Sequence, residues 1–278
     1  MSGLDTQARK QRVISVFDEV ASGYDNPALR FFPFSAERAL GHLNPKPGSK
    51  ILDAATGTGA LAMALAQAVG PQGRVIGIDL STAMLERATH NAAKMALNNI
   101  DLLEMDAEAP DFRSNYFDAV TCGFGLFFLP DMLAALKQWR RITRPGGTVL
   151  FTSFTAEAFA PLAEHFFTTL ESFGLDFSGD QQLASQRLVE ADSCRGLMEE
   201  AGFEAIEQYT DQLGYPLHSP NDWWEVVWNS GLRGIVQRLP AGQQEEFQRA
   251  HLAQLDSLQT EKGLWMGVEV RITLGRVP

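Results

Sequence analysis

Two aspartates and a glycine-rich turn occupy positions where a nucleoside could bind. The apolar run 50–54 contains Asp53 and leads into Gly57-Thr58-Gly59. Such a turn between a strand and a helix lets a ligand approach backbone N–H groups at the positive end of the helix. Asp79 ends the next apolar run, 20 residues after Gly59, where an acidic residue can bind ribose hydroxyls. The spacing predicts either a dinucleotide site or a nucleoside site.

Two carboxylates separate these alternatives. The segment 57–62 fits the G-x-G-x-x-A pattern, so an NAD-linked oxidoreductase is one hypothesis. However, Asp53 stands just before the glycines, where it would repel a pyrophosphate but could attract an ammonium group. Asp106 follows the third apolar run and is placed to accept a hydrogen bond from the exocyclic amine of adenine. Together they favour the nucleoside site over NAD.

Short apolar runs alternate with longer stretches of helical periodicity, which is typical of a parallel sheet covered by helices. We predict strands at 50–54, 74–78, 101–105, 116–122 and 148–154. The helix predicted at 59–69 is apolar nearly all round, as expected for a helix packed on a sheet. Ser81 can cap the next helix, and Asp131 opens another that ends at the turn 144–147. The predicted fold class is α/β.

The flanking regions are predicted to be more helical. We predict helices at 4–22, 36–43, 156–173 and 192–201, a loop at 174–185, strands at 203–209 and 263–275, and a mostly helical stretch at 211–261. This pattern suggests an N-terminal helical segment at 1–45, a cofactor-binding domain at 46–210 with 262–278, and a helical cap insertion at 211–261. If the strand at 203–209 is parallel to the others, the cap begins on the ligand side of the sheet.

Composition limits the function further. The chain has 278 residues, with 23 Lys and Arg against 34 Asp and Glu, a formal charge of −11 that disfavours nucleic acid as a partner. It has only two cysteines, Cys122 and Cys194, which cannot build a disulfide framework and indicate a reducing compartment. The N-terminus lacks the apolar core of a signal peptide, and no apolar run approaches about 18 residues. We therefore expect a cytoplasmic protein without stable membrane insertion. Because no zinc-type ligand spacing occurs, no metal is expected.

The order and spacing of several motifs resemble the class I S-adenosylmethionine-dependent methyltransferases of the type 11 group. The chain is most similar to the ubiquinone/menaquinone-biosynthesis C-methyltransferases. The resemblance covers roughly residues 13–155. It rests on VFDEVASGYD at 16–25, DLSTAML at 79–85, DAE at 106–108, and GFGL at 123–126 followed by Pro130-Asp131.

The resemblance implies a Rossmann-like, seven-stranded, mostly parallel sheet with a reversed last strand, and S-adenosyl-L-methionine as the cofactor. Asp53, Thr58 and the glycines would surround its methionine part, Asp79 its ribose, and Asp106 with Ala107 its adenine, while Gly123 would lie beside the sulfonium. Ala55 stands at the position of the first family glycine. The full set of implied cofactor-binding residues is Tyr24, Asp53, Ala55, Gly57, Thr58, Gly59, Asp79, Leu80, Met84, Asp106, Ala107 and Gly123.

The expected reaction is transfer of the sulfonium methyl group to a small-molecule acceptor. Phe127-Phe128 stand where the quinone enzymes usually carry Arg-Asn, so a quinone-like acceptor and another partly apolar metabolite both remain open. We expect Tyr24 and His165 as candidate catalytic residues. An apolar acceptor wall is expected from Phe124, Phe127, Phe128, Trp223 and Trp224. A nucleic-acid methyltransferase and a non-catalytic cofactor-binding protein are further alternatives.

Overall fold

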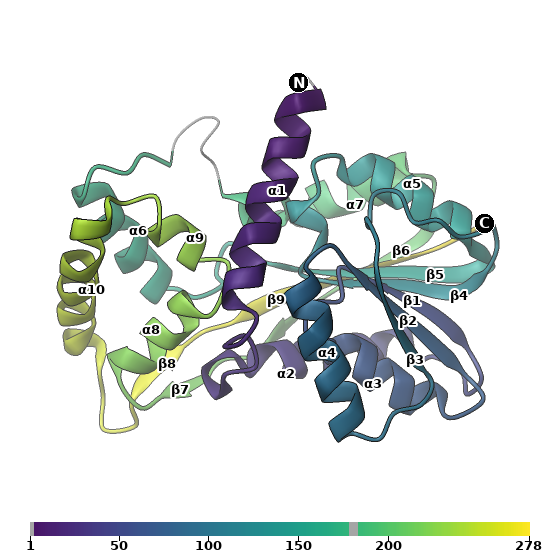
Figure 1. Cartoon of the computed structure of the whole chain (residues 1–278), viewed down its shortest axis with the longest axis horizontal. Coiled ribbons are helices and arrows are strands. Elements are labelled where there is room, and N and C mark those ends of the chain that lie inside the picture. The colour runs from purple at the N-terminus through teal and green to yellow at the C-terminus, as the bar shows by residue number, and fades with distance from the viewer. Residues whose placement is uncertain (1–2, 178–182) are drawn as a thin grey trace.

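The computed structural model describes residues 3–177 and 183–278, and its centre is a seven-stranded sheet with the order β3-β2-β1-β4-β5-β9-β6 (Figure 1). Its strands are β1 (Lys50–Ala54), β2 (Arg74–Asp79), β3 (Ile100–Glu104), β4 (Phe117–Gly123), β5 (Thr143–Phe154), β6 (Glu204–Gln212) and β9 (Glu269–Arg276). The first five pair in parallel, whereas β9 runs antiparallel to both β5 and β6. The Rossmann-like sheet with a reversed last strand is confirmed.

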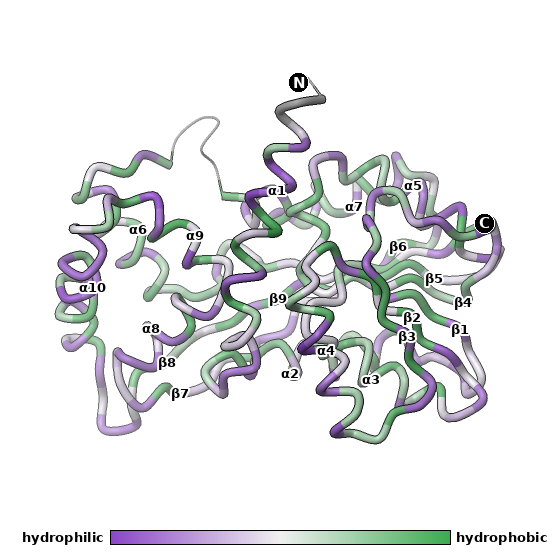
Figure 2. Tube along the Cα trace, viewed as in Figure 1, coloured by the Kyte–Doolittle hydropathy of each residue, from purple (hydrophilic) through white to green (hydrophobic). Residues whose placement is uncertain are grey.

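Helices cover both faces of this sheet, because the central strands are apolar on both sides. Ile51 packs with α2 (Phe31–Leu43) and α3 (Ala60–Val69) on one face, where α4 (Thr82–Lys94) also lies. Leu52 faces the opposite core with α5 (Met132–Ile142) and α7 (Ala191–Glu200). In Figure 2 the central strands are mainly hydrophobic, as expected for strands buried on both faces.

The predicted helix starts are confirmed by their caps. The Ser81 hydroxyl accepts a hydrogen bond from the backbone N–H of Met84 at 3.1 Å, and the Asp131 carboxylate accepts one from Ala134 at 2.9 Å. Each bond satisfies one of the N–H groups that the first turn of a helix leaves without a partner. These caps fix where α4 and α5 leave the ligand edge of the sheet.

Two helices differ from the sequence prediction in where they begin. The helix α2 starts at Phe31 rather than at 36, after a 3-10 turn at Pro27–Leu29, and Pro33 falls in its first turn. Proline is tolerated there because that N–H has no helical partner. Conversely, α6 (Leu162–Ser172) starts later than the predicted 156, directly after Pro161. The residue before a proline is biased away from helical geometry, so the helix does not extend backwards.

The C-terminal segment differs from its sequence prediction more than these two helices do. The stretch predicted as mostly helical contains α8 (Pro220–Trp228), α9 (Arg233–Val236) and α10 (Ala241–Leu255), but also β7 (Tyr215–Leu217). It pairs with β8 (Leu264–Met266), so the single strand predicted at 263–275 is two strands. Between β8 and β9, the backbone N–H of Val268 donates to the side-chain oxygen of Gln212 at 2.7 Å. This side-chain contact lies where the strand pairing is interrupted. Residues 178–182 of the predicted loop lie outside the described residues.

The N-terminal helix α1 (Gly3–Val20) contacts α4 beside the sheet and α9 of the group formed by α6, α8, α9 and α10 (Figure 1). It therefore stands between the two halves of the molecule, above the carboxyl ends of the parallel strands. Of the helices described, none is both long and apolar enough to cross a membrane.

Candidate functional site

A cavity of about 340 Å³ lies at the carboxyl ends of β1, β2 and β4. Its floor is formed by the glycine turn after β1 and by the loops that follow β2, β3 and β4, while α1 and the start of α2 close it from the other side. Open α/β sheets bind ligands at this edge, where the strand order reverses between β1 and β4. Its lining combines carboxylates with aromatic rings.

The glycine turn has the open backbone that a close ligand requires. Gly57 has a φ of +56°, and a Cβ added to it would meet nothing within 4 Å. Gly59 also has a positive φ, and a Cβ there would lie 2.6 Å from the Met63 side chain. Ala55 adopts a φ of +53°, which is unusual for a residue with a side chain. Its Cβ is accommodated because Gly125 lies opposite, where another Cβ would come within 2.6 Å.

Asp53 is held by two hydroxyl groups. Its side chain is only 1% exposed, and its two oxygens accept hydrogen bonds from Thr56 and Thr121, each at 2.7 Å. Burial raises the pKa of Asp53 to about 6, although the two hydroxyls favour the charged form. The carboxylate is therefore mostly ionised at neutral pH, in a place that favours a cationic partner.

Asp79 is fixed by the backbone. It accepts hydrogen bonds from the Gly57 N–H at 2.8 Å and from the Ser81 N–H at 2.9 Å, one on each oxygen. Burial raises its pKa, while these N–H groups oppose the shift. The backbone of Leu80 also hydrogen-bonds this carboxylate, which therefore lies fixed in the lining of the cavity.

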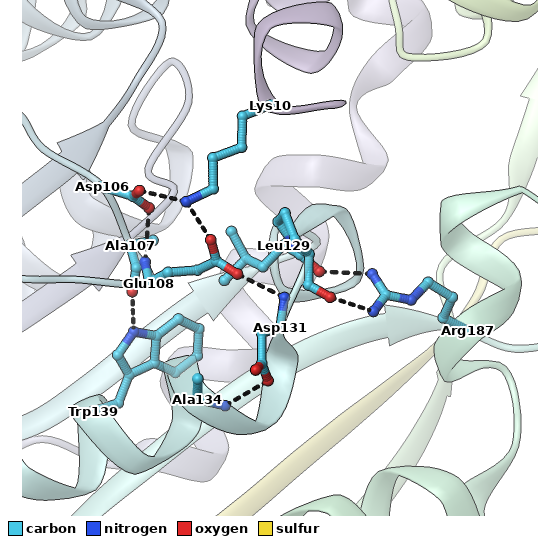
Figure 3. A network of polar contacts seen from close by, with 10 residues as sticks. Lys10, Asp106, Ala107, Glu108, Leu129, Asp131, Ala134, Trp139 and Arg187 are labelled. Atoms are coloured by element: carbon cyan, nitrogen blue, oxygen red, sulfur yellow. Dashed lines mark hydrogen bonds and ion pairs between the residues drawn. The ribbon is translucent and has the colours of Figure 1, made fainter. Parts of the chain in front are cut away.

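Asp106 lies in the loop after β3. One of its oxygens accepts the Glu108 N–H at 2.9 Å, and the other is 2.6 Å from the ammonium group of Lys10 (Figure 3). The neighbouring Ala107 carbonyl accepts the indole N–H of Trp139 at 2.8 Å, which anchors this loop on α5. The loop is therefore held rigidly against the cavity.

Aromatic side chains also line the cavity. Tyr24 stacks on Phe32 with ring centroids 4.8 Å apart, and Phe124 meets Phe32 edge to face at 5.6 Å. Phe128 meets Phe17 of α1 edge to face at 5.1 Å. Burial and the nearby carboxylates of Asp79 and Asp25 raise the pKa of Tyr24 above its usual range, so the phenol stays protonated at neutral pH.

The structure brings most of the predicted site residues together. All the predicted cofactor-binding residues line the cavity except Gly59, which supports the turn from behind. Phe124 and Phe128 also line it, whereas Phe127 is buried behind them.

Three predicted residues lie elsewhere. Trp223, Trp224 and His165 do not line the cavity but belong to the helices beside the sheet. Trp223 is fully buried and donates its indole N–H to Nε2 of His251 at 2.8 Å, and Trp224 stacks on Trp228. Within residues 3–177 and 183–278, no cluster of His, Cys, Asp and Glu could hold a metal ion.

Sequence reasoning missed two contributions. Lys10, Val13, Ile14 and Phe17 of α1 line the cavity. Their spacing of three and four residues marks one helical face and was available as a signal. Arg187 donates to the carbonyls of Leu129 and Pro130 (Figure 3) and to that of Phe127, and so holds the loop after β4. Nothing in the local sequence indicates this contact, because it spans about sixty residues.

Comparisons with known proteins agree with this geometry. The model of the ubiE/COQ5 methyltransferase family matches residues 5–215. The chain is 32% identical over 214 residues to aklanonic acid methyltransferase DauC of Streptomyces sp. (strain C5), covering 74% of this chain and 97% of that protein. It is 34% identical over 217 residues to demethylmenaquinone methyltransferase of Staphylococcus epidermidis, covering 73% of this chain and 89% of that protein.

Solved structures share the fold at lower identity. A methyltransferase-like protein of Bacillus halodurans C-125 has a TM-score of 0.59 and 20% identity, covering 88% of this chain and 99% of that one. The [4+2]-cyclase SpnF has a TM-score of 0.59 and 21% identity, covering 88% of this chain and 81% of that one.

Proposed function

Because this chain belongs to the ubiE/COQ5 methyltransferase family and is an S-adenosylmethionine-dependent methyltransferase, we propose that it methylates a quinone-like small molecule in the cavity beneath α1. The observation that carries this proposal is that carboxylates and aromatic rings line one cavity. We propose that the carboxylates, here called the carboxylate end, bind the cofactor and that the rings, here called the aromatic end, bind a planar acceptor.

The carboxylate end fits S-adenosylmethionine. We assign Asp53 to the ammonium group, Asp79 to the ribose hydroxyls, and Asp106 to the adenine amine. In support, the Asp79 carboxylate lines the cavity and is held in place by backbone N–H groups, and Gly57 presents open backbone to the ligand. When bound, the cofactor supplies an electrophilic methyl group on a positively charged sulfur.

The aromatic end supports a planar acceptor. Phe32, Phe124 and Phe128 present rings around the same space, and ring faces and edges pack favourably against a flat conjugated molecule. One relative is named for demethylmenaquinone and another for aklanonic acid. We therefore place the acceptor between these rings, with the loop after β4 as one wall.

The protein contributes mainly by alignment. Holding the nucleophile and the methyl group in line can supply about 7–11 kcal/mol, and aromatic walls exclude water. Tyr24, whose phenol stays protonated, would act as a hydrogen-bond donor rather than a base. Trp223 would support the wall from behind, because Phe159 meets Trp223 at 6.1 Å and Phe31 at 5.5 Å. His165 is given no role in the reaction.

We also propose that the protein works in the cytoplasm. Cys122 and Cys194 are both free and buried, which suits a reducing compartment.

The acceptor proposal is tested by calorimetric titration of 1,4-naphthoquinone into the protein saturated with S-adenosylhomocysteine. We expect Phe128→Ala to weaken naphthoquinone binding about tenfold, since an aromatic contact and its buried area are lost. Affinity for S-adenosylhomocysteine should stay within about twofold.

The matched control is Phe34→Ala. Phe34 lies on α2 but is 39% exposed and does not line the cavity, so neither affinity should change. Equal naphthoquinone affinity in the wild type and Phe128→Ala would contradict the proposed wall.

A further inference from the structure

The helix α1 covers the cavity with one face. Lys10, Val13, Ile14 and Phe17 all line the cavity, so a stripe of this helix lies against the ligand space. A ligand in the cavity lies against this stripe, so an outward movement of the stripe would widen the path by which the ligand enters and leaves. The contacts that hold the stripe in place therefore bear on ligand exchange.

Lys10 makes the polar contact at the outer end of this stripe. Its ammonium group lies 2.6 Å from Asp106 and also pairs with the carboxylate of Glu108 (Figure 3). The Lys10 and Glu108 side chains are only 17% and 12% exposed. Burial lowers the pKa of Lys10, but its hydrogen bonds to Asp106 and Glu108 outweigh this and raise it overall, so the group is charged.

This ion pair connects three walls of the cavity. The second oxygen of Glu108 accepts the backbone N–H of Asp131 at 2.6 Å, at the end of the loop after β4. Arg187 holds the same loop from its other side (Figure 3). Lys10 is therefore attached to a fixed base, formed by the loops after β3 and β4.

The C-terminal end of α1 makes hydrogen bonds of its own. Asp18 accepts a hydrogen bond from the Ser81 hydroxyl at 2.6 Å. The Glu19 carbonyl accepts a hydrogen bond from Arg233, and the Glu19 carboxylate accepts one from Gln237. Among the described side chains between residues 6 and 17, Lys10 alone forms an ion pair. The ion pairs of Lys10 are therefore the polar side-chain contacts that hold this part of α1 against the loops after β3 and β4.

We propose that Lys10 is a cofactor-site residue whose ion pairs with Asp106 and Glu108 hold α1 closed over the adenine end and set the rate of cofactor exchange. The inference rests on the assignment of Asp106 to the adenine end made above, but not on the identity of the acceptor. Lys10 also offsets the repulsion between two neighbouring carboxylates, so that Asp106 stays in position to accept the adenine amine.

The test measures the dissociation rate of radiolabelled S-adenosylhomocysteine after a chase with excess unlabelled ligand. Lys10→Met keeps most of the stem but removes the charge, and should speed dissociation about tenfold, because partly buried carboxylates lose their partner. Lys10→Arg keeps the charge and should restore a rate within about threefold of the wild type. Arg12→Met, an exposed change on the same helix, should leave the rate unchanged.

The outcomes separate this proposal from simpler ones. A purely structural lysine would lower the melting temperature in Lys10→Met without changing the dissociation rate, and that result overturns the proposal. An equal effect of Arg12→Met overturns it as well. If Lys10→Met does not fold, Glu108→Gln should speed dissociation several-fold, and an unchanged rate there counts against the proposal. Failure of the wild type to bind S-adenosylhomocysteine would instead refute the cofactor assignment itself.

Discussion

At the scale of single residues, three carboxylates share one cavity but differ in what holds them. Hydroxyl groups hold Asp53, backbone N–H groups hold Asp79, and an ammonium group holds Asp106. In these surroundings the pKa of Asp53 is about 6, close to physiological pH. Asp79 is instead a rigidly held hydrogen-bond acceptor. The carboxylates should therefore respond differently to substitution and to pH.

We expect Asp79→Ala to weaken S-adenosylhomocysteine binding tenfold or more. Hydrogen bonds to a charged group contribute about 1.5–3 kcal/mol each, and the ribose hydroxyls would then face an apolar methyl group. Calorimetric titration measures the dissociation constant, and Asp111→Ala, an exposed aspartate outside the cavity, is the control. An unchanged constant in folded Asp79→Ala would remove this residue from the site.

Cofactor affinity should also fall as the pH drops below about 6. Asp53 has a pKa of about 6 in the ligand-free protein, so below that value it becomes protonated and no longer attracts an ammonium group. Titrations with S-adenosylhomocysteine between pH 5 and pH 8 should show this loss in the wild type. The Asp53→Asn variant should bind more weakly at pH 8 and lack this step, and a step of the same size in the variant would contradict the assignment.

The Asp53 carboxylate should also make the ligand-free protein less stable at high pH than at low pH. Its pKa is raised on folding from 3.8 to about 6, so the native state binds more protons than the unfolded state between these values. Its contribution is favourable at low pH and is lost as the pH rises through about 6. Urea unfolding should therefore show the stability of Asp53→Asn rising relative to that of the wild type between pH 5 and pH 8, by about 1.4 kcal/mol. A gain in the opposite direction would contradict this.

At the scale of elements, α8 supports the proposed acceptor wall without lining the cavity, because its Trp223 packs against Phe159. We expect Trp223→Phe to lower the free energy of unfolding by about 1–3 kcal/mol, because His251 loses the only donor to its Nε2 among the described residues. Urea unfolding measures the loss. Trp224→Phe should cost less, since no hydrogen bond of its indole is formed within the described chain, and equal losses would contradict this reading.

The elements that sequence predicts well are those whose signals are local. Strands β1 and β2 and helix α3 were predicted to within a residue or two, since continuous apolar runs and caps such as Ser81 are read directly from the chain. The predicted start of α2 at residue 36 is wrong, because the helix already begins at Phe31 and its first turn tolerates Pro33.

Prediction of the candidate site is also limited to what local sequence signals and strand order show. The carboxylates follow strands in order, so parallel topology alone brings them together. Arg187 and the placement of Trp223 depend on contacts across long stretches of chain, and no local pattern encodes these.

At the scale of the whole molecule, a bound cofactor should stabilise the contacts that α1 makes with α4 on one side and with α9 on the other. At about 100 times its dissociation constant, S-adenosylhomocysteine should add about 2.7 kcal/mol to the free energy of unfolding. Hydrogen exchange should slow in α1 and in the loop after β4, which line the cavity, but not in the outer turns of α10. Uniform slowing along the whole chain would contradict a lid formed by α1.

We propose that one cavity brings S-adenosylmethionine and a planar quinone-like acceptor together for methyl transfer. The most direct measurement is mass spectrometry after incubation with S-adenosylmethionine carrying a deuterated methyl group and a panel of quinols, hydroxynaphthoquinones and anthraquinone carboxylic acids. We expect one of these acceptors to gain the labelled methyl group while S-adenosylhomocysteine accumulates in equal amount. A protein that binds S-adenosylhomocysteine normally but labels none of the panel would contradict the claim.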